Sequence, residues 1–190
     1  MLYATASQTV GPYLHIGLDW LNSGEMAGPD VSGERVTITG VLTDANDKPI
    51  PDGMVEFWQA NAHGKHNHPD DPQKLPVEEG FLGFARMRTD AEGHFTISAI
   101  RPGRVPGADG KTPQAPHITV SVFVRSVLKR LATRIYFGDE AGAQANAEDA
   151  VLKLIPAEHH ATLIAKPLGG GKFEWNVRIQ SGAETVFFEV

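Results

Sequence analysis

The chain has 190 residues, a formal net charge of −6 and no cysteine. Its 41% hydrophobic and 21% charged residues are ordinary for a globular domain, and the length suits one domain with a sizeable core. The acidic balance argues against nucleic acid as a partner, and the lack of cysteine excludes disulfides, Cys-ligated metals and thiol nucleophiles. Without a membrane-length apolar run or a basic segment in residues 1–34, we expect no membrane partner, no secretory signal and a cytoplasmic location.

Period-two alternation of apolar and polar residues dominates the chain and predicts short strands. Turn-forming clusters rich in Gly, Asp, Asn and Pro separate them. In chain order, the candidate strands are 36–43, 54–59, 84–88, 95–98, 117–124, 133–137, 173–179 and 185–190. We therefore predict a mainly β fold, an antiparallel β-sandwich with long loops. One or two short helices are expected within 139–154 and 158–165.

Two stretches fit neither strand nor helix. Residues 1–34 are irregular and contain two Gly-Pro breaks, and residues 60–83 are rich in Gly, Pro, His and Asp. Long loops in compact domains are often functional. We expect an N-terminal arm over 1–34, followed by a β-sandwich domain over 35–190.

Three histidines, His63, His66 and His68, lie within six residues of the second loop. With a further imidazole, for example His117, they could ligate a divalent metal. The simpler interpretation is a solvated polar loop, with His117 a buried hydrogen-bonded side chain at the start of a strand. The spacing matches no known metal motif, so both interpretations stay open.

A cluster of basic residues stands out in this acidic chain: Arg125, Lys129, Arg130 and Arg134. A planar guanidinium matches a carboxylate in bidentate fashion, so the cluster could orient an anionic substrate. The simpler interpretation, which we favour, is a basic surface loop that pairs with neighbouring acids. Nucleotide-binding, serine-hydrolase and HExxH motifs are absent, so the residues alone predict no reaction.

Three segments together, residues 7–17, 55–62 and 115–125, resemble the intradiol ring-cleaving dioxygenases. Residues 133–140, 163–166 and 182–190 continue the resemblance in order, so that it spans nearly the whole chain. This family cleaves a catechol between its two hydroxyl-bearing carbons with a non-haem ferric ion. The resemblance implies an iron site of two tyrosinates and two histidines, since phenolate oxygens stabilise the hard Fe(III) cation.

The four positions that correspond to those ligands hold His66, Val105, His117 and Thr119. Only His117 matches the implied ligand type, and neither tyrosine is present. The resemblance therefore implies that these are vestigial ligand positions and that this chain does not bind the catalytic iron.

The departure fits the iron-free α type of chain found in heteromeric members of the family. The resemblance then implies a homologous β subunit that holds Fe(III), higher assembly of αβ pairs, and protocatechuate and O₂ as substrates. Arg125 is the implied catalytic-pocket residue, since a cation suits the ring carboxylate of the substrate. The implied substrate-cavity lining is Thr9, Gly11, Pro12 and Tyr13.

The N-terminal arm carries apolar residues that would be poorly placed on an isolated chain, namely Leu14, Ile16, Leu18, Trp20 and Leu21. We expect the arm to dock on the partner, where burial of such residues stabilises the pair. Two other functions remain as alternatives. One is a non-catalytic, transthyretin-like sandwich that binds small molecules, and the other is an independent metalloenzyme using His63, His66, His68 and His117.

Overall fold

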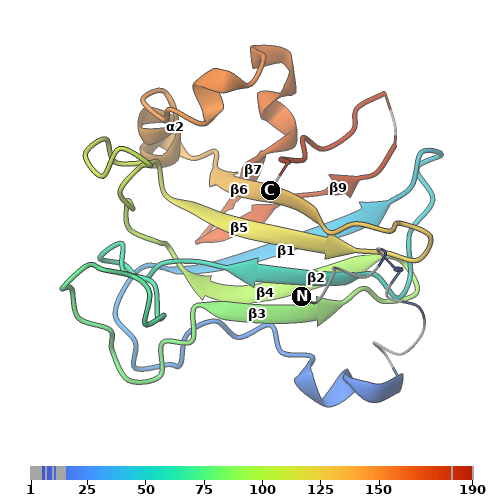
Figure 1. The fold of residues 1–190 in the computed structure, drawn as a ribbon, viewed down its shortest axis with the longest axis horizontal. Coiled ribbons are helices and arrows are strands. Elements are labelled where there is room, and N and C mark those ends of the chain that lie inside the picture. The colour runs from blue at the N-terminus through green and yellow to red at the C-terminus, as the bar shows by residue number, and fades with distance from the viewer. Residues whose placement is uncertain (1–5, 7, 10, 12–15, 181, 190) are drawn as a thin grey trace.

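The computed structural model describes residues 6, 8, 9, 11, 16–180 and 182–189. Within them, nine strands form one sheet (Figure 1). The strands are β1 (Arg35–Thr43), β2 (Met54–Trp58), β3 (Phe84–Arg88), β4 (His94–Ile100), β5 (His117–Phe123), β6 (Leu131–Phe137), β7 (Ile164–Gly169), β8 (Lys172–Glu174) and β9 (Val177–Arg178).

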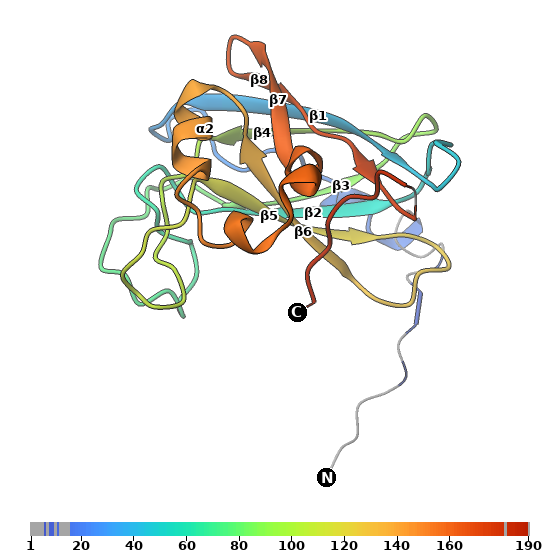
Figure 2. The ribbon, with the colours of Figure 1, turned by 90° about the horizontal axis from the view of Figure 1, so that it is seen from above.

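The sheet folds over into two layers around the main core. Its strand order is β3-β2-β5-β6-β7-β8-β1-β4, with β9 also pairing with β1. Figure 2 shows β1 and β4 in one layer and β2, β5 and β6 in the other. Apolar side chains from both layers meet between them, among them Ile38, Phe57, Ile97 and Val120, all fully buried. The end strands β3 and β4 lie against each other, so the sheet is nearly closed.

The prediction of a mainly β fold is confirmed, but the prediction of purely antiparallel pairing is wrong. The pairs β6–β7, β1–β8 and β1–β9 are parallel. A parallel pair needs a crossover connection. Between β6 and β7 it is helical, formed by α2 (Glu140–Asn146) and the 3₁₀ turns η2 (Leu152–Leu154) and η3 (Ala157–Thr162). One continuous, folded-over sheet thus takes the place of two separate sandwich sheets.

Most expected strands form, and the differences have local causes. The predicted strand 173–179 splits into β8 and β9, because the Asn176 side chain accepts from the Val41 amide at 3.0 Å between them. In 185–189 no strand forms; only an isolated bridge joins Phe188 to Ala132. The strand β7 was not predicted. In the helical region, α2 lies within the expected 139–154, and the side chain of Asp139 caps it by accepting from the Gly142 amide.

Part of the predicted N-terminal arm packs on this chain's own sheet. Ser23 and Ala27 make bridges to Arg86 and Phe81, and Met26 and Val31 are buried. Before this segment, the short 3₁₀ turn η1 (Asp19–Leu21) projects from the body of the domain (Figure 1).

Candidate functional site

The strand β5 carries sequence-predicted residues at both of its ends. His117 and Thr119 lie at its start, and Arg125 follows its end. Eight residues of extended chain span about 26 Å, so the two ends of β5 belong to separate places on the molecule. We describe them in turn as the His117 cavity and the Arg125 end.

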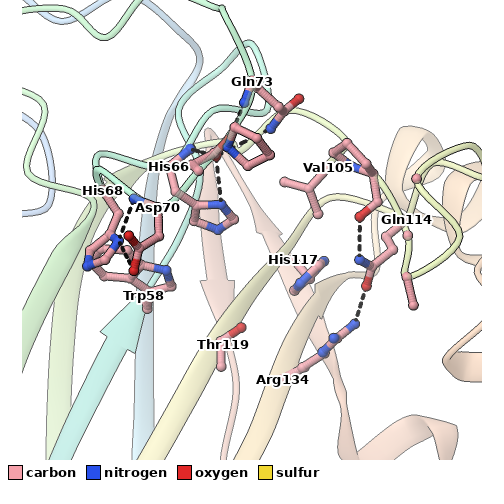
Figure 3. Close-up of a pocket in the computed structure, with 16 residues that line it drawn as sticks. Trp58, His66, His68, Asp70, Gln73, Val105, Gln114, His117, Thr119 and Arg134 are labelled. Carbon is pink, nitrogen blue, oxygen red and sulfur yellow. Dashed lines mark hydrogen bonds and ion pairs between the residues drawn. The ribbon is translucent and has the colours of Figure 1, made fainter.

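The His117 cavity is an open hollow of about 740 Å³. Its walls come from the loops before β3 and before β5, and its floor from β2, β5 and β6 (Figure 3). All four vestigial ligand positions line it, so the structure brings together the residues that the resemblance grouped. The lining residues used below are Trp58, His66, Asp70, Asp71, Val105, Gln114, His117, Thr119 and Arg134.

On one wall, the ring of His66 stacks on Trp58, with centroids 5.8 Å apart and planes 3° from parallel. Burial lowers the pKa of His66, although the nearby Asp71 partly offsets this. Asp71 lies on the same wall, where Lys65 Nζ approaches its carboxylate to 3.2 Å. Burial alone would raise the pKa of Asp71, but the backbone amides of Gln73 and His66, with Lys65, hold it at about 2. The negative charge of Asp71 is thus fixed and already paired.

On the floor, His117 is buried and its Nδ1 lies 2.8 Å from the Ala115 carbonyl oxygen. Burial, followed by the nearby Arg134 guanidinium, lowers the pKa of His117 to about 4. The imidazole is therefore neutral at pH 7. Because a carbonyl can only accept, Nδ1 carries the proton and donates to Ala115, which leaves Nε2 as an acceptor.

The donor set of this cavity does not fit a ferric tyrosinate site. Val105 offers no ligand atom, and Thr119 offers only a hydroxyl. The nearby tyrosine, Tyr136, has its ring centroid 5.7 Å from that of His117 but is fully buried, with its hydroxyl bonded to Asp149. Burial raises the pKa of Tyr136 to about 12, so it stays a protonated phenol and not the anionic ligand that Fe(III) prefers.

The histidines of the second loop do not form a local metal site with His117 either. His63 is exposed and does not line the cavity, and the half-exposed His68 packs edge-on against Trp58. Among the described residues, only Asp90, Glu92 and His94 bring three potential ligand atoms close together, and all three are exposed. The geometry therefore does not support the independent metalloenzyme.

At the Arg125 end, a residue of the N-terminal segment meets the loop after β5. The Thr9 hydroxyl donates to the Val124 carbonyl at 3.3 Å and accepts from the Ser126 amide at 3.0 Å, on either side of Arg125. Ser126 has φ of 69°, a left-handed conformation that the Thr9 hydroxyl helps to hold. Arg125 itself is 55% exposed and donates from Nη2 to Asp52 at 3.0 Å.

Thr9 and Arg125, separated by more than a hundred residues in the sequence, are thus neighbours, as a shared pocket wall would require. Gly11 has φ of 62°, which a glycine adopts without strain. Pro12, Tyr13 and Leu14 lie outside the described residues. Farther along the arm, Ile16 and Trp20 are 70% and 79% exposed.

The basic cluster of the sequence divides between the two ends of β5. Arg125, Lys129 and Arg130 lie in the exposed loop between β5 and β6, whereas Arg134 lies on β6 opposite Thr119 and lines the His117 cavity. The sequence analysis gave Arg134 no separate role. The register of the β5–β6 pair is the signal that would have placed it beside His117.

The comparisons agree with this architecture. A family model described as "Dioxygenase" matches residues 20–181. The chain is 40% identical to the protocatechuate 3,4-dioxygenase alpha chain of Burkholderia cepacia, over 100% of this chain and 98% of that protein. The chain belongs to the intradiol dioxygenase family.

A second relative and a solved structure extend this placement. The protocatechuate 3,4-dioxygenase beta chain of Burkholderia cepacia is 40% identical over 55% of this chain and 45% of its own length. The structure of an intradiol ring-cleavage dioxygenase from Tetranychus urticae superposes with a TM-score of 0.62 at 22% identity, covering 93% of this chain and 94% of that one. None of the helices among the described residues combines the length and the apolar character that a membrane span needs.

Proposed function

We propose that this chain is the α subunit of a protocatechuate 3,4-dioxygenase. Paired with a homologous β subunit, it would cleave protocatechuate with O₂ to 3-carboxy-cis,cis-muconate. The observation that carries the proposal is the 40% identity to an α chain along essentially the whole length of both proteins. The weaker coverage of the β-chain match supports the α assignment, since it leaves 45% of this chain outside the alignment.

We place the ferric ion on the β subunit. Four positions around the His117 cavity would have to supply its ligands, and two of them, Val105 and Thr119, hold an aliphatic side chain and a neutral hydroxyl. Among the described residues no phenolate is available there, because Tyr136 is buried, protonated and hydrogen-bonded to Asp149. A ferric ion held by the partner would supply the activation of the catechol toward O₂.

This chain would contribute the Arg125 end to the partner's active site. The Arg125 guanidinium, exposed and beside the N-terminal segment, can pair with the ring carboxylate of protocatechuate. The segment containing Thr9, Gly11, Pro12 and Tyr13 would line the substrate cavity. The exposed Ile16 and Trp20 are suited to burial against the β subunit. The cytoplasmic location and the assembly of several αβ pairs stay predictions.

The test is to express the chain alone, with an iron-bearing β homologue, and the β homologue alone. Iron content and ring cleavage of protocatechuate are then measured for each. We expect the lone chain to be iron-free and inactive, and the co-expressed pair to contain ferric iron and to be active. A lone chain that holds stoichiometric ferric iron and cleaves the ring would refute both the subunit assignment and the placement of the metal.

A further inference from the structure

The His117 cavity has no role in the proposed function, which uses the opposite end of β5. It is nevertheless a built pocket. Its volume of about 740 Å³ lies in the range of small-molecule sites, and an aromatic pair, a cation and a buried imidazole line it. Each of these groups favours a particular chemical group on a ligand.

The cation is Arg134, which is half-buried on β6 and held in place by its neighbours. Its Nη1 donates to Gln114 Oε1 at 2.7 Å and to the Tyr136 hydroxyl at 3.3 Å, and Gln114 is itself anchored on the Pro106 carbonyl at 2.9 Å (Figure 3). Within the described part of the chain, Arg134 forms no ion pair with a carboxylate, and its Nε and Nη2 groups have no hydrogen-bond partner. An oriented guanidinium with donors to spare can bind an anion.

The acids of the cavity do not neutralise Arg134. The carboxylate of Asp71 is paired with Lys65 on the opposite wall. The side chain of Asp70 is 91% exposed and projects into solvent beside His68. The nearest buried acid, Asp149, accepts from the Tyr136 hydroxyl and from three backbone amides, those of Ala115, Val151 and Leu152. An incoming anion would therefore find a positive charge at Arg134 with donors still available.

The second polar group, His117, can bind a hydrogen-bond donor of the ligand. Its Nδ1 is committed to the Ala115 carbonyl, so its Nε2 can accept from a ligand hydroxyl. The cavity also has the stacked Trp58–His66 pair on one side and the buried, aliphatic Val105 on the other (Figure 3). A planar ring packs well against such walls.

We propose that the His117 cavity binds a small aromatic carboxylate that carries a hydroxyl group, a hydroxybenzoate, and does so without iron. The carboxylate pairs with Arg134, the hydroxyl donates to His117 Nε2, and the ring lies between Val105 and the Trp58–His66 pair. The site belongs to this chain alone and is distinct from the pocket that the Arg125 end would help to form with a partner.

The probe is 4-hydroxybenzoate, whose single hydroxyl removes it from ring cleavage between two hydroxyl-bearing carbons. Titration calorimetry on the full-length chain should show one saturable site. The neutral 4-hydroxybenzamide should bind at least about 10-fold more weakly, since it lacks the charge that Arg134 recognises. Benzoate should bind about 2- to 10-fold more weakly, since it lacks the hydroxyl donor. These ligand comparisons need no variant and thus no assumption about folding.

Variants locate the site. Arg134→Gln should weaken 4-hydroxybenzoate binding about 10- to 100-fold, and Arg134→Lys should weaken it less. Arg130→Gln, which removes an exposed charge in the adjacent loop, is the matched control and should leave the affinity unchanged.

Three results would overturn the proposal. The first is no saturable binding up to about 10 mM 4-hydroxybenzoate, a concentration above the dissociation constant expected of a weak small-molecule site. The others are equal affinity for the acid and the amide, and inorganic phosphate that binds as tightly as the hydroxybenzoate. Ring cleavage by the αβ pair is not read in this assay, so a failure here leaves the proposed subunit function standing.

Discussion

Burial of a neutral imidazole at His117 predicts a specific loss of stability in mild acid. The pKa of this side chain is about 4 in the folded chain, against 6.5 when unfolded. A group whose pKa is lowered by folding stabilises the protein fully above its unfolded pKa, and that contribution declines as the pH falls toward the folded pKa. Between pH 7 and pH 5, the unfolded His117 gains a proton that the folded one does not.

The size of the effect follows from the two pKa values. Proton linkage gives a loss of about 2 kcal/mol between pH 7 and pH 5, and about 3 kcal/mol once the pH reaches 4 and below. For a chain of this length, 2 kcal/mol corresponds to about 4–8 °C in Tm. Carboxylates with lowered pKa values, Asp71 among them, and the partly buried His66 add to the decline in acid. A variant that changes only His117 is therefore needed to isolate its share.

The assay is urea denaturation of the full chain at intervals from pH 7.5 to pH 5, compared with His117→Asn. The asparagine amide can still donate to the Ala115 carbonyl but does not titrate. We expect the wild type to lose about 2 kcal/mol more than the variant over this range. His63→Asn, which replaces an exposed imidazole, should keep the wild-type dependence. Parallel declines in the wild type and in His117→Asn would refute the argument that His117 is buried and neutral.

Other parts of the structure give three further predictions. In the αβ complex, Arg125→Ala should lower kcat/KM for protocatechuate about 10- to 100-fold with unchanged iron content, while the control Arg130→Ala should leave kcat/KM unaltered. Steady-state kinetics and iron analysis measure both variants. Loss of iron in Arg125→Ala would contradict the role of Arg125. Removal of residues 1–13 should weaken pairing or turnover, measured by sedimentation and ring cleavage, and full activity would exclude the segment from the pocket. Asp149→Ala should lower the free energy of unfolding, measured by urea denaturation, by about 3–5 kcal/mol, because the buried carboxylate accepts from three amides and the Tyr136 hydroxyl. A loss below about 1 kcal/mol would contradict this role.

Strand positions could be predicted from the sequence because burial on one face leaves a period of two. The prediction of 84–88 coincides with β3, and 117–124 differs from β5 by one residue. Alternation does not report strand direction, since parallel and antiparallel strands share the period. The strand β7 escaped detection because Lys166 and Pro167 interrupt its apolar pattern and most of its residues are exposed.

The site was predicted in part. The resemblance grouped His66, Val105, His117 and Thr119, and the structure places all four around one cavity. Their separation in the sequence would not have shown this, because the loops before β3 and β5 fold over the sheet through side-chain contacts, such as the stacking of His66 on Trp58 and the hydrogen bond from Arg134 to Gln114. Thr9 and Arg125 were expected to share a surface on the strength of the resemblance, and one hydroxyl joins their segments.

Neither the alternation of apolar residues nor the family resemblance predicted the position of Arg134. Its place beside His117 depends on the register of β5 against β6, which pairs Thr119 with Arg134 across a connecting loop of seven residues. A shift of one residue would turn the guanidinium to the other face of the sheet. The sequence lists a cluster of four cations, and only the register shows that one of them enters the cavity.

His117 and Arg134, on the floor of the cavity, lower the stability of the chain in acid. Burial, followed by the neighbouring Arg134 guanidinium, lowers the pKa of the His117 imidazole, and the chain loses about 3 kcal/mol of stability in acid as a result. An apolar residue at position 117 would avoid this loss, and an acid near Arg134 would neutralise its charge. The structure instead keeps a neutral His117 and an Arg134 without a carboxylate partner in the lining of one cavity, while the Gln114 and Ala115 contacts hold both in place. Such an arrangement is stabilised when a ligand brings a hydroxyl and a negative charge together, as a hydroxybenzoate does.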